Sequence, residues 1–272
     1  MRNHTLSTLF AVGAAAITLA FASGCGSAPA AVDAASDHAA ATETISDRAV
    51  NAASAPCEPL KVGALFDVTK SMADSQIVPP SVADFEPLLK RIEACGGEIG
   101  VGLIDEKPGA PLLRYHADPS PAPPHLTPGN NAISAAIDRN TKMAAYEERR
   151  QAWEKDQDRQ AALADFRTGL DPILSRRLDA RFSPVWISVR RISVFMAEPV
   201  TFNGVAPRKY CLLITDGQDT TTAPPATLPP DLNGIAVING SGSVGVLGVL
   251  HPVRFESLSA ALAWVLQKEE QK

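Results

Sequence analysis

The chain has 272 residues, of which 45% are hydrophobic and 20% charged, which is ordinary for a globular protein with a buried core. One or two domains are expected at this length. The net charge of −5 and the lack of a long basic run in the sequence argue against nucleic acid as the main partner.

Residues 1–24 have the features of a secretion signal. Arg2 and the amino terminus are positive, and residues 9–22 are almost wholly apolar but too few to span a bilayer comfortably. Cys25 then resembles the acylated cysteine of bacterial lipoproteins, although that family usually has Leu where this chain has Ala22. The resemblance implies an exported protein that is lipid-anchored to the bacterial cell envelope. The alternative is a plain signal cut elsewhere, with Cys25 incidental.

Residues 25–56 are rich in Ala, Ser, Asp and Thr and contain no Phe, Trp or Tyr. This composition predicts a flexible tether between the anchor and a domain that extends from residue 57 to residue 272. An alanine-rich helix is the alternative, and it would be isolated and only marginally stable.

The predicted domain begins with a strand, a helix and two more strands. The apolar run 60–67 predicts the first strand. A helix follows the candidate N-cap Ser81 and stops at the glycine pair 96–97, because its apolar residues recur at helical spacing up to that point. Residues 98–105 and 111–117 are further strand candidates, and a loop rich in Pro and Asn comes after them.

Cys57 and Cys95 each lie just before one of two successive strand candidates. If these strands are parallel neighbours, both cysteines lie at the same edge of the sheet, and we predict a Cys57–Cys95 disulfide. Cys211 lies inside an apolar run and is expected to be a buried small hydrophobic residue. A zinc site is not expected, because the sequence has no CxxC motif and no Cys/His cluster.

A long helical stretch is predicted from about residue 132 to residue 178, within an insertion that ends near residue 180. Its middle is charged on nearly all sides, so the helix should project or lie on the surface with only a thin apolar stripe. Acidic and basic residues nearly balance there. This balance favours a solvated helical excursion over an arm that binds a specific partner.

The later elements alternate helix and strand. Ser183 and Pro184 suit the N-cap and first position of a helix, and the apolar run 209–216 ends in Asp216. Residues 234–242 and 243–250 are further strand material, and a strand end and an amphipathic helix follow in residues 254–267. Continuous apolar strands that alternate with helices indicate an α/β fold: a Rossmann-like, doubly wound, mostly parallel sheet flanked by helices.

In such a sheet, ligands bind outside the carboxyl ends of the strands. Asp67 and Asp216 end two strands, Thr69 and Ser71 alternate in what we expect to be an extended loop, and Ser183 begins a helix. A few carboxylates with several neutral oxygens suit Mg²⁺, with Mn²⁺ or Ca²⁺ as alternatives. Each residue alone is an ordinary turn or cap residue, but the joint pattern predicts a metal site.

The sequence "DVTKS" at residues 67–71 resembles the Asp-x-Ser-x-Ser loop of the von Willebrand factor A (VWA) domain, with Thr69 in place of the first Ser. The sequence "ITDGQD" resembles the Asp-Gly that follows the fourth strand of that family. The family's Thr ligand corresponds best to Ser183, with Asn131 and Thr127 as alternatives. The resemblance covers about residues 60–267, and the long charged helix departs from the family's shorter ones.

The resemblance implies binding rather than catalysis. In this family hydroxyls and waters hold Mg²⁺ at a metal-ion-dependent adhesion site (MIDAS), and an acidic side chain of a protein partner takes an open coordination position. A protein of this kind mediates adhesion or another protein–protein interaction and is not an enzyme. The two alternatives are a Mg²⁺-dependent phosphoryl-transfer enzyme with Asp67 as nucleophile and a structural envelope protein whose metal site has decayed.

Overall fold

The computed structural model describes residues 57–74, 77–126, 131–218, 232, 235–238 and 244–267, all of which belong to one compact unit, Ala52–Lys272. The predicted signal, the tether with Cys25, and Thr127 lie outside these residues. Within the described ranges, no helix has both the length and the apolar character needed to cross a membrane.

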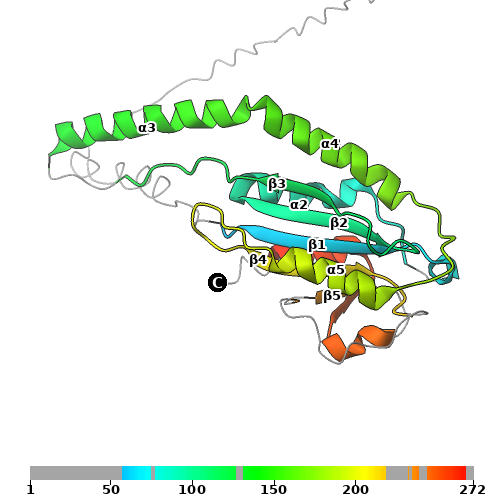
Figure 1. The fold of residues 1–272 in the computed structure, drawn as a ribbon. Coiled ribbons are helices and arrows are strands. Elements are labelled where there is room, and N and C mark those ends of the chain that lie inside the picture. The colour runs from blue at the N-terminus through cyan, green and yellow to red at the C-terminus, as the bar shows by residue number, and fades with distance from the viewer. Residues whose placement is uncertain are drawn as a thin grey trace, which may run out of the picture. The chain divides into compact units, whose positions relative to one another are not determined.

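The core of the domain is a six-stranded, mostly parallel sheet with helices on both sides (Figure 1). The strand order is β3-β2-β1-β4-β5-β6, and only β3 runs antiparallel to its neighbour. The strands are β1 Leu60–Asp67, β2 Gly97–Ile104, β3 Leu113–Ala117, β4 Arg208–Ile214, β5 Ile235–Ile238 and β6 Val253–Phe255. The predicted α/β fold with a mostly parallel sheet is confirmed.

The direction of winding reverses between β1 and β4. From the central strand β1, the chain first adds β2 and β3 on one side and later adds β4, β5 and β6 on the other. Asp67 at the end of β1 is level with Ile104 at the end of β2, and Phe66 is level with Ile214 at the end of β4. The carboxyl ends of three parallel strands therefore meet at one edge, at the switch point where ligands bind in sheets of this class.

Two hydrophobic cores cover the two faces of the sheet. Side chains of β1 alternate between them, because successive residues of a strand point to opposite faces: Val62, Ala64 and Phe66 lie in one core and Leu65 in the other. The first core is shared by α2 (Val82–Cys95), α4 (Gln157–Leu174) and α6 (Leu258–Gln267), and the second by α5 (Val185–Ala197) and the 3₁₀-helix η2 (Gly245–Leu250).

The long charged stretch is helical, as predicted, but it is two helices, and only the first of them is a solvated excursion. Helix α3 (Ala132–Glu154) has no buried side chain, and α4 begins after Asp156, whose side chain accepts a hydrogen bond from the backbone N–H of Arg159 at 3.1 Å. Helix α4 buries Leu163, Phe166 and Leu170 against the sheet. It is part of the layer that covers one face.

Several charged side chains of α4, which the sequence suggests are solvated, instead form ion pairs with side chains of α2. The Arg167 guanidinium donates two hydrogen bonds of 2.8 Å to the Glu86 carboxylate, and Arg159 pairs with Glu93. A helix that looks charged all round can therefore still pack closely, because its basic side chains meet acidic ones on the next helix.

The predicted strand at 243–250 is also wrong, because Gly245–Leu250 forms the 3₁₀-helix η2. Gly245 has φ +53°, and the backbone N–H of Val246 donates to the carbonyl of Gly217 at 3.0 Å. This contact with the turn after β4 takes the place of the ladder hydrogen bonds that a strand would make. The remaining strands differ from the predictions mainly in where they begin and end.

A disulfide joins Cys57, just before β1, to Cys95, at the end of α2, with 5.5 Å between their Cα atoms. The two cysteines are brought together because β1 and β2 are parallel neighbours with Leu60 level with Gly97. Cys211 is buried in β4 as a free thiol, and burial raises its pKa to about 12.

Candidate metal centre

Asp67 is the centre of a cluster of hydroxyl groups. Its side chain is only 3% exposed. Oδ1 accepts hydrogen bonds from the backbone N–H of Thr69 at 3.0 Å and from the Thr69 hydroxyl at 2.7 Å. Oδ2 accepts from the hydroxyls of Ser183 at 2.9 Å and Thr215 at 2.7 Å. Three segments far apart in sequence therefore converge on one carboxylate.

Burial raises the pKa of Asp67, and the hydrogen bonds from Thr215, Thr69 and Ser183 oppose this shift without cancelling it. The ionised carboxylate is thus less stable here than in water. A nearby cation would favour the ionised form, because an opposite charge acts strongly on a group that is poorly solvated.

Thr69 and Ser71 lie close together, but not in the extended loop that the sequence suggests. Ser71 belongs to a 3₁₀-helix, η1 (Lys70–Asp74), which starts where the backbone N–H of Met72 donates to the carbonyl of Thr69 at 3.1 Å. The hydroxyl oxygens of Thr69 and Ser71 are 3.1 Å apart. A tight turn brings them together instead of an alternating strand-like backbone.

Ser183 is brought to Asp67 by a short pairing between two loops. The backbone N–H of Ala180 donates to the carbonyl of Val68 at 3.2 Å, and the N–H of Lys70 donates to the carbonyl of Ala180 at 3.1 Å. Ser183 is not the N-cap of α5, as the sequence suggests; Pro184 holds that position, and the Ser183 hydroxyl donates to Asp67 instead.

The two other candidates for the ligand role of Ser183 are Asn131 and Thr127. Asn131 caps α3, where its side chain accepts a hydrogen bond from the backbone N–H of Ile133 at 3.0 Å. Thr127 lies outside the described residues. Of the three candidates for this role, Ser183 is the one that the structure brings to Asp67.

Asp216 lies in the turn after β4 and has one buried oxygen with no hydrogen-bond partner among the described residues. Its Oδ1 accepts from the backbone N–H of Gln218 at 2.9 Å, whereas Oδ2 is the unpartnered atom. A buried polar atom without a partner costs about 1–3 kcal/mol. Coordination to a cation would offset this cost.

Thr215 is the site residue that sequence reasoning missed. It is fully buried, its hydroxyl donates to Asp67, and its oxygen accepts from the backbone N–H of Gly217 at 3.1 Å. The signal was a hydroxyl residue at the end of an apolar strand, directly before Asp216.

The donor set fits a hard cation such as Mg²⁺. A hydroxyl has one proton to donate and two lone pairs. Thr69 and Ser183 each donate the hydroxyl proton to Asp67, so their oxygens are oriented as acceptors, and Ser71, 3.1 Å from Thr69, adds a third hydroxyl oxygen. These hydroxyls and the buried Oδ2 of Asp216, with the Asp67 carboxylate behind the hydroxyls that donate to it, form an all-oxygen set of the kind that Mg²⁺ prefers.

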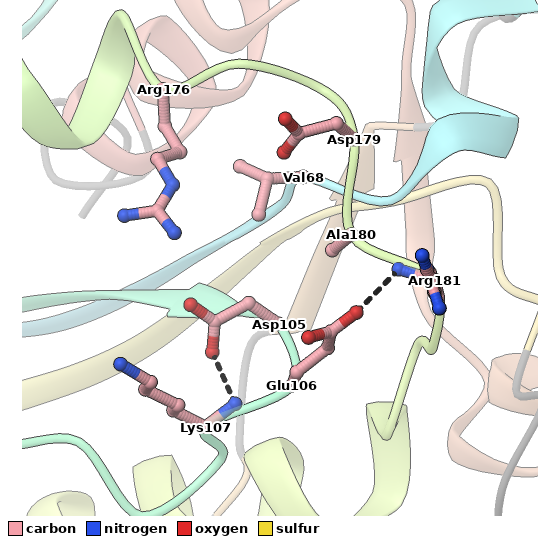
Figure 2. Close-up of a pocket in the computed structure, with 8 residues that line it drawn as sticks. All are labelled: Val68, Asp105, Glu106, Lys107, Arg176, Asp179, Ala180 and Arg181. Carbon is pink, nitrogen blue, oxygen red and sulfur yellow. Dashed lines mark hydrogen bonds between the residues drawn. The ribbon is translucent and has the colours of Figure 1, made fainter.

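Two hollows flank this edge of the sheet. One has a volume of about 250 Å³, touches Asp67 and Val68, and is lined mostly by apolar side chains, including Met72, Ile77 and Leu178. The other, of about 360 Å³, is shown in Figure 2 and is lined mostly by charged side chains. Val68, in the loop after β1, therefore lines both hollows.

Comparison with protein-family models, with curated proteins and with solved structures gives no match.

Proposed function

We propose that this chain is an exported bacterial lipoprotein whose domain binds a protein partner through Mg²⁺, in the manner of a VWA domain. The observation that carries the proposal is the cluster of Thr69, Ser183 and Thr215 hydroxyls on the buried carboxylate of Asp67. It lies at the switch point of the sheet, beside the turn that holds Asp216, which is where the VWA resemblance requires a metal site.

In this proposal the chain's own residues prepare the site before the cation arrives. Asp67 orients the hydroxyls of Thr69 and Ser183, and Ser71 is held against Thr69 at 3.1 Å. Asp216 contributes the carboxylate oxygen that has no other partner among the described residues. The bound Mg²⁺ supplies an electrophilic coordination position for an acidic side chain of the partner, and the partly desolvated surroundings strengthen that charge interaction.

The same features favour binding over phosphoryl transfer. A nucleophilic aspartate needs an oxygen that can reach the phosphorus atom. Both oxygens of Asp67 already accept two hydrogen bonds each, and the side chain is 3% exposed. Phosphatase and ATPase assays test this choice, and turnover that Asp67→Asn abolishes would overturn it.

Titration calorimetry with Mg²⁺, Mn²⁺ and Ca²⁺ tests the metal site directly. The wild-type chain should bind one Mg²⁺, and Asp67→Asn and Asp216→Asn should weaken binding by about 100-fold or more, because each removes a carboxylate charge at the cation. Asp74→Asn is the matched control, since Asp74 is exposed at the end of η1. If the wild type binds no cation, the alternative of a structural envelope protein with a decayed site gains support.

The lipid anchor has a separate test. Cells grown with a tagged fatty acid should label the wild-type protein, and Cys25→Ala should carry no label because the acylated thiol is missing. Absence of label on the wild type, or label that survives Cys25→Ala, would contradict the anchor and leave the metal site untouched.

A further inference from the structure

The 360 Å³ cavity beside the cation site contains cationic side chains without a protein partner among the described residues. It lies between the loop after β2 (Asp105, Glu106 and Lys107) and the segment that leads from α4 to Ser183 (Arg176, Asp179 and Arg181). Val68, the residue after Asp67, forms part of its wall (Figure 2). The cavity is therefore continuous with the loop that carries the proposed cation site.

Each acidic side chain of this cavity already has an interaction within the protein. Asp105 accepts a hydrogen bond from the backbone N–H of Lys107 at 2.8 Å. Burial lowers the pKa of Arg191, and the negative charge of Asp105 opposes that shift. Glu106 accepts from the backbone N–H of Arg181 at 2.9 Å. Asp179 lies 3.7 Å from the guanidinium of Arg177. Each acidic side chain of the cavity thus has a hydrogen-bond donor or a basic group beside it.

The charged groups of Lys107 and Arg176 differ from these acidic side chains. Among the described residues, neither the ammonium group nor the guanidinium makes a hydrogen bond or an ion pair. In Figure 2 the two side chains extend toward the same side of the view with the Asp105 carboxylate between them, whereas Glu106 contacts the backbone N–H of Arg181. A guanidinium carries five N–H donors and an ammonium three, so this side of the cavity can hold an oxyanion with charge-assisted hydrogen bonds.

We propose that Lys107 and Arg176 bind a second carboxylate of the same partner, so that the domain recognises a segment with two acidic side chains. This inference rests on the proposed function, because the first carboxylate is the one that binds the metal. Two exposed cations beside an anchored ligand should improve affinity by about fivefold to tenfold.

The test uses the full chain, Mg²⁺ and capped glycine peptides of defined charge. The peptides carry one glutamate, two glutamates, or one glutamate and one lysine, with zero to three glycines between the charged residues. The best two-glutamate peptide should bind about fivefold to tenfold more tightly than the one-glutamate peptide. The double variant Lys107→Gln/Arg176→Gln should lose this preference, with unchanged affinity for Mg²⁺ and for the one-glutamate peptide.

Arg190→Gln is the matched control, because Arg190 is exposed on α5 and does not line the cavity. The inference is overturned if Mg²⁺ binds but the two-glutamate peptides gain nothing, if the glutamate–lysine peptide binds best, or if the double variant keeps the preference. A wild-type chain that binds no Mg²⁺ instead refutes the proposed function, and the inference with it.

Discussion

The hydroxyl oxygen of Thr215 lies 2.7 Å from Oδ2 of Asp67, to which it donates a hydrogen bond. The same oxygen accepts a hydrogen bond from the backbone N–H of Gly217 at 3.1 Å. One buried side chain therefore connects the carboxylate at the end of β1 with the turn after β4 that carries Asp216.

Replacement of Thr215 by Val should weaken both the fold and the cation site. Valine keeps the shape but removes the hydroxyl, which leaves Asp67 with one donor fewer and Gly217 without its acceptor. We expect a loss of about 1–3 kcal/mol in the free energy of unfolding and a fall of about tenfold in Mg²⁺ affinity. Urea unfolding and calorimetry measure the two effects. Thr215→Ser keeps a hydroxyl, so its stability and its Mg²⁺ affinity should both be closer to those of the wild type. Equal defects in Thr215→Val and Thr215→Ser would contradict a role for the hydroxyl.

The buried carboxyl of Asp67 should make stability depend on pH. Burial raises its pKa above the ordinary value of 3.8, although its hydrogen bonds oppose the shift. Between that value and the raised pKa, the folded chain binds a proton that the unfolded chain has released. The contribution of Asp67 to the free energy of unfolding is therefore fully present below pH 3.8 and is lost as the pH rises through the raised pKa.

Urea unfolding at a series of pH values, with EDTA present, measures this effect as the difference between the wild type and Asp67→Asn. As the pH rises, the free energy of unfolding of the wild type should fall relative to that of Asp67→Asn, because the amide of the variant does not titrate. Mg²⁺ should reverse the trend, since it binds the ionised form. A difference that is independent of pH in EDTA would show that Asp67 titrates normally in the folded chain.

Gly217 should be intolerant of a side chain. It has φ +74°, and a Cβ atom there would lie 2.4 Å from the carbonyl oxygen of Val244. Gly204 has a similar φ of +79° but open space around it. Both alanine variants should pay about 1–2 kcal/mol for the left-handed backbone, whereas only Gly217→Ala should add about 1–3 kcal/mol for the collision and weaken Mg²⁺ binding. Equal effects would mean that the contact with Val244 can relax.

Thiol chemistry should separate Cys211 from the other two cysteines of the domain. Burial raises the pKa of Cys211 to about 12, so almost no thiolate forms at pH 8 and the native protein should resist alkylation at this residue. After denaturation without reduction, Cys211 should react, and mass spectrometry should find the Cys57 and Cys95 peptides still joined. Alkylated Cys57 and Cys95 in that sample would contradict the disulfide.

Lys61 should be important for stability and unimportant for cation binding. Its side chain is fully buried at the start of β1, where Nζ lies 3.1 Å from the Glu98 carboxylate and donates to the carbonyl of Glu198 at 3.0 Å. Lys61→Met should cost about 3–5 kcal/mol because it leaves Glu98 with only the more distant Arg114, at 4.0 Å, and Glu98→Gln in the same chain should recover part of the loss. Mg²⁺ affinity should stay unchanged, since Asp67 is at the opposite end of the strand.

Local patterns were enough to predict several elements of this protein. The apolar run 60–67 is the strand β1 with the predicted bounds, and the apolar residues predicted at helical spacing after Ser81 belong to α2, which ends just before the glycine pair 96–97. Each such prediction rests on side-chain periodicity within a single element. The predicted Cys57–Cys95 pair needed only one further assumption, that two successive strands are parallel neighbours.

Contacts between distant segments could not be predicted in this way. The separations of 116 residues between Asp67 and Ser183 and of 148 between Asp67 and Thr215 are closed only by the folded sheet and by the pairing of Val68 with Ala180. The charges of α4 concealed its buried stripe, because Arg159 and Arg167 pair with α2. The tight turn at Ser71 replaced an expected extended loop, with a local hydrogen bond from Met72 to Thr69 and a contact of Lys70 with the distant Ala180.

The sequence by itself determined the class of fold and the chemical character of the site, since apolar strands, helical stripes and oxygen-bearing residues at strand ends are local properties. Only the tertiary structure decided that four hydrogen bonds converge on Asp67, that Thr215 joins Ser183 there, and that one oxygen of Asp216 is buried without a partner among the described residues. The physical reason is that burial and hydrogen-bond partners depend on which segments pack together, and no stretch of sequence contains that information alone.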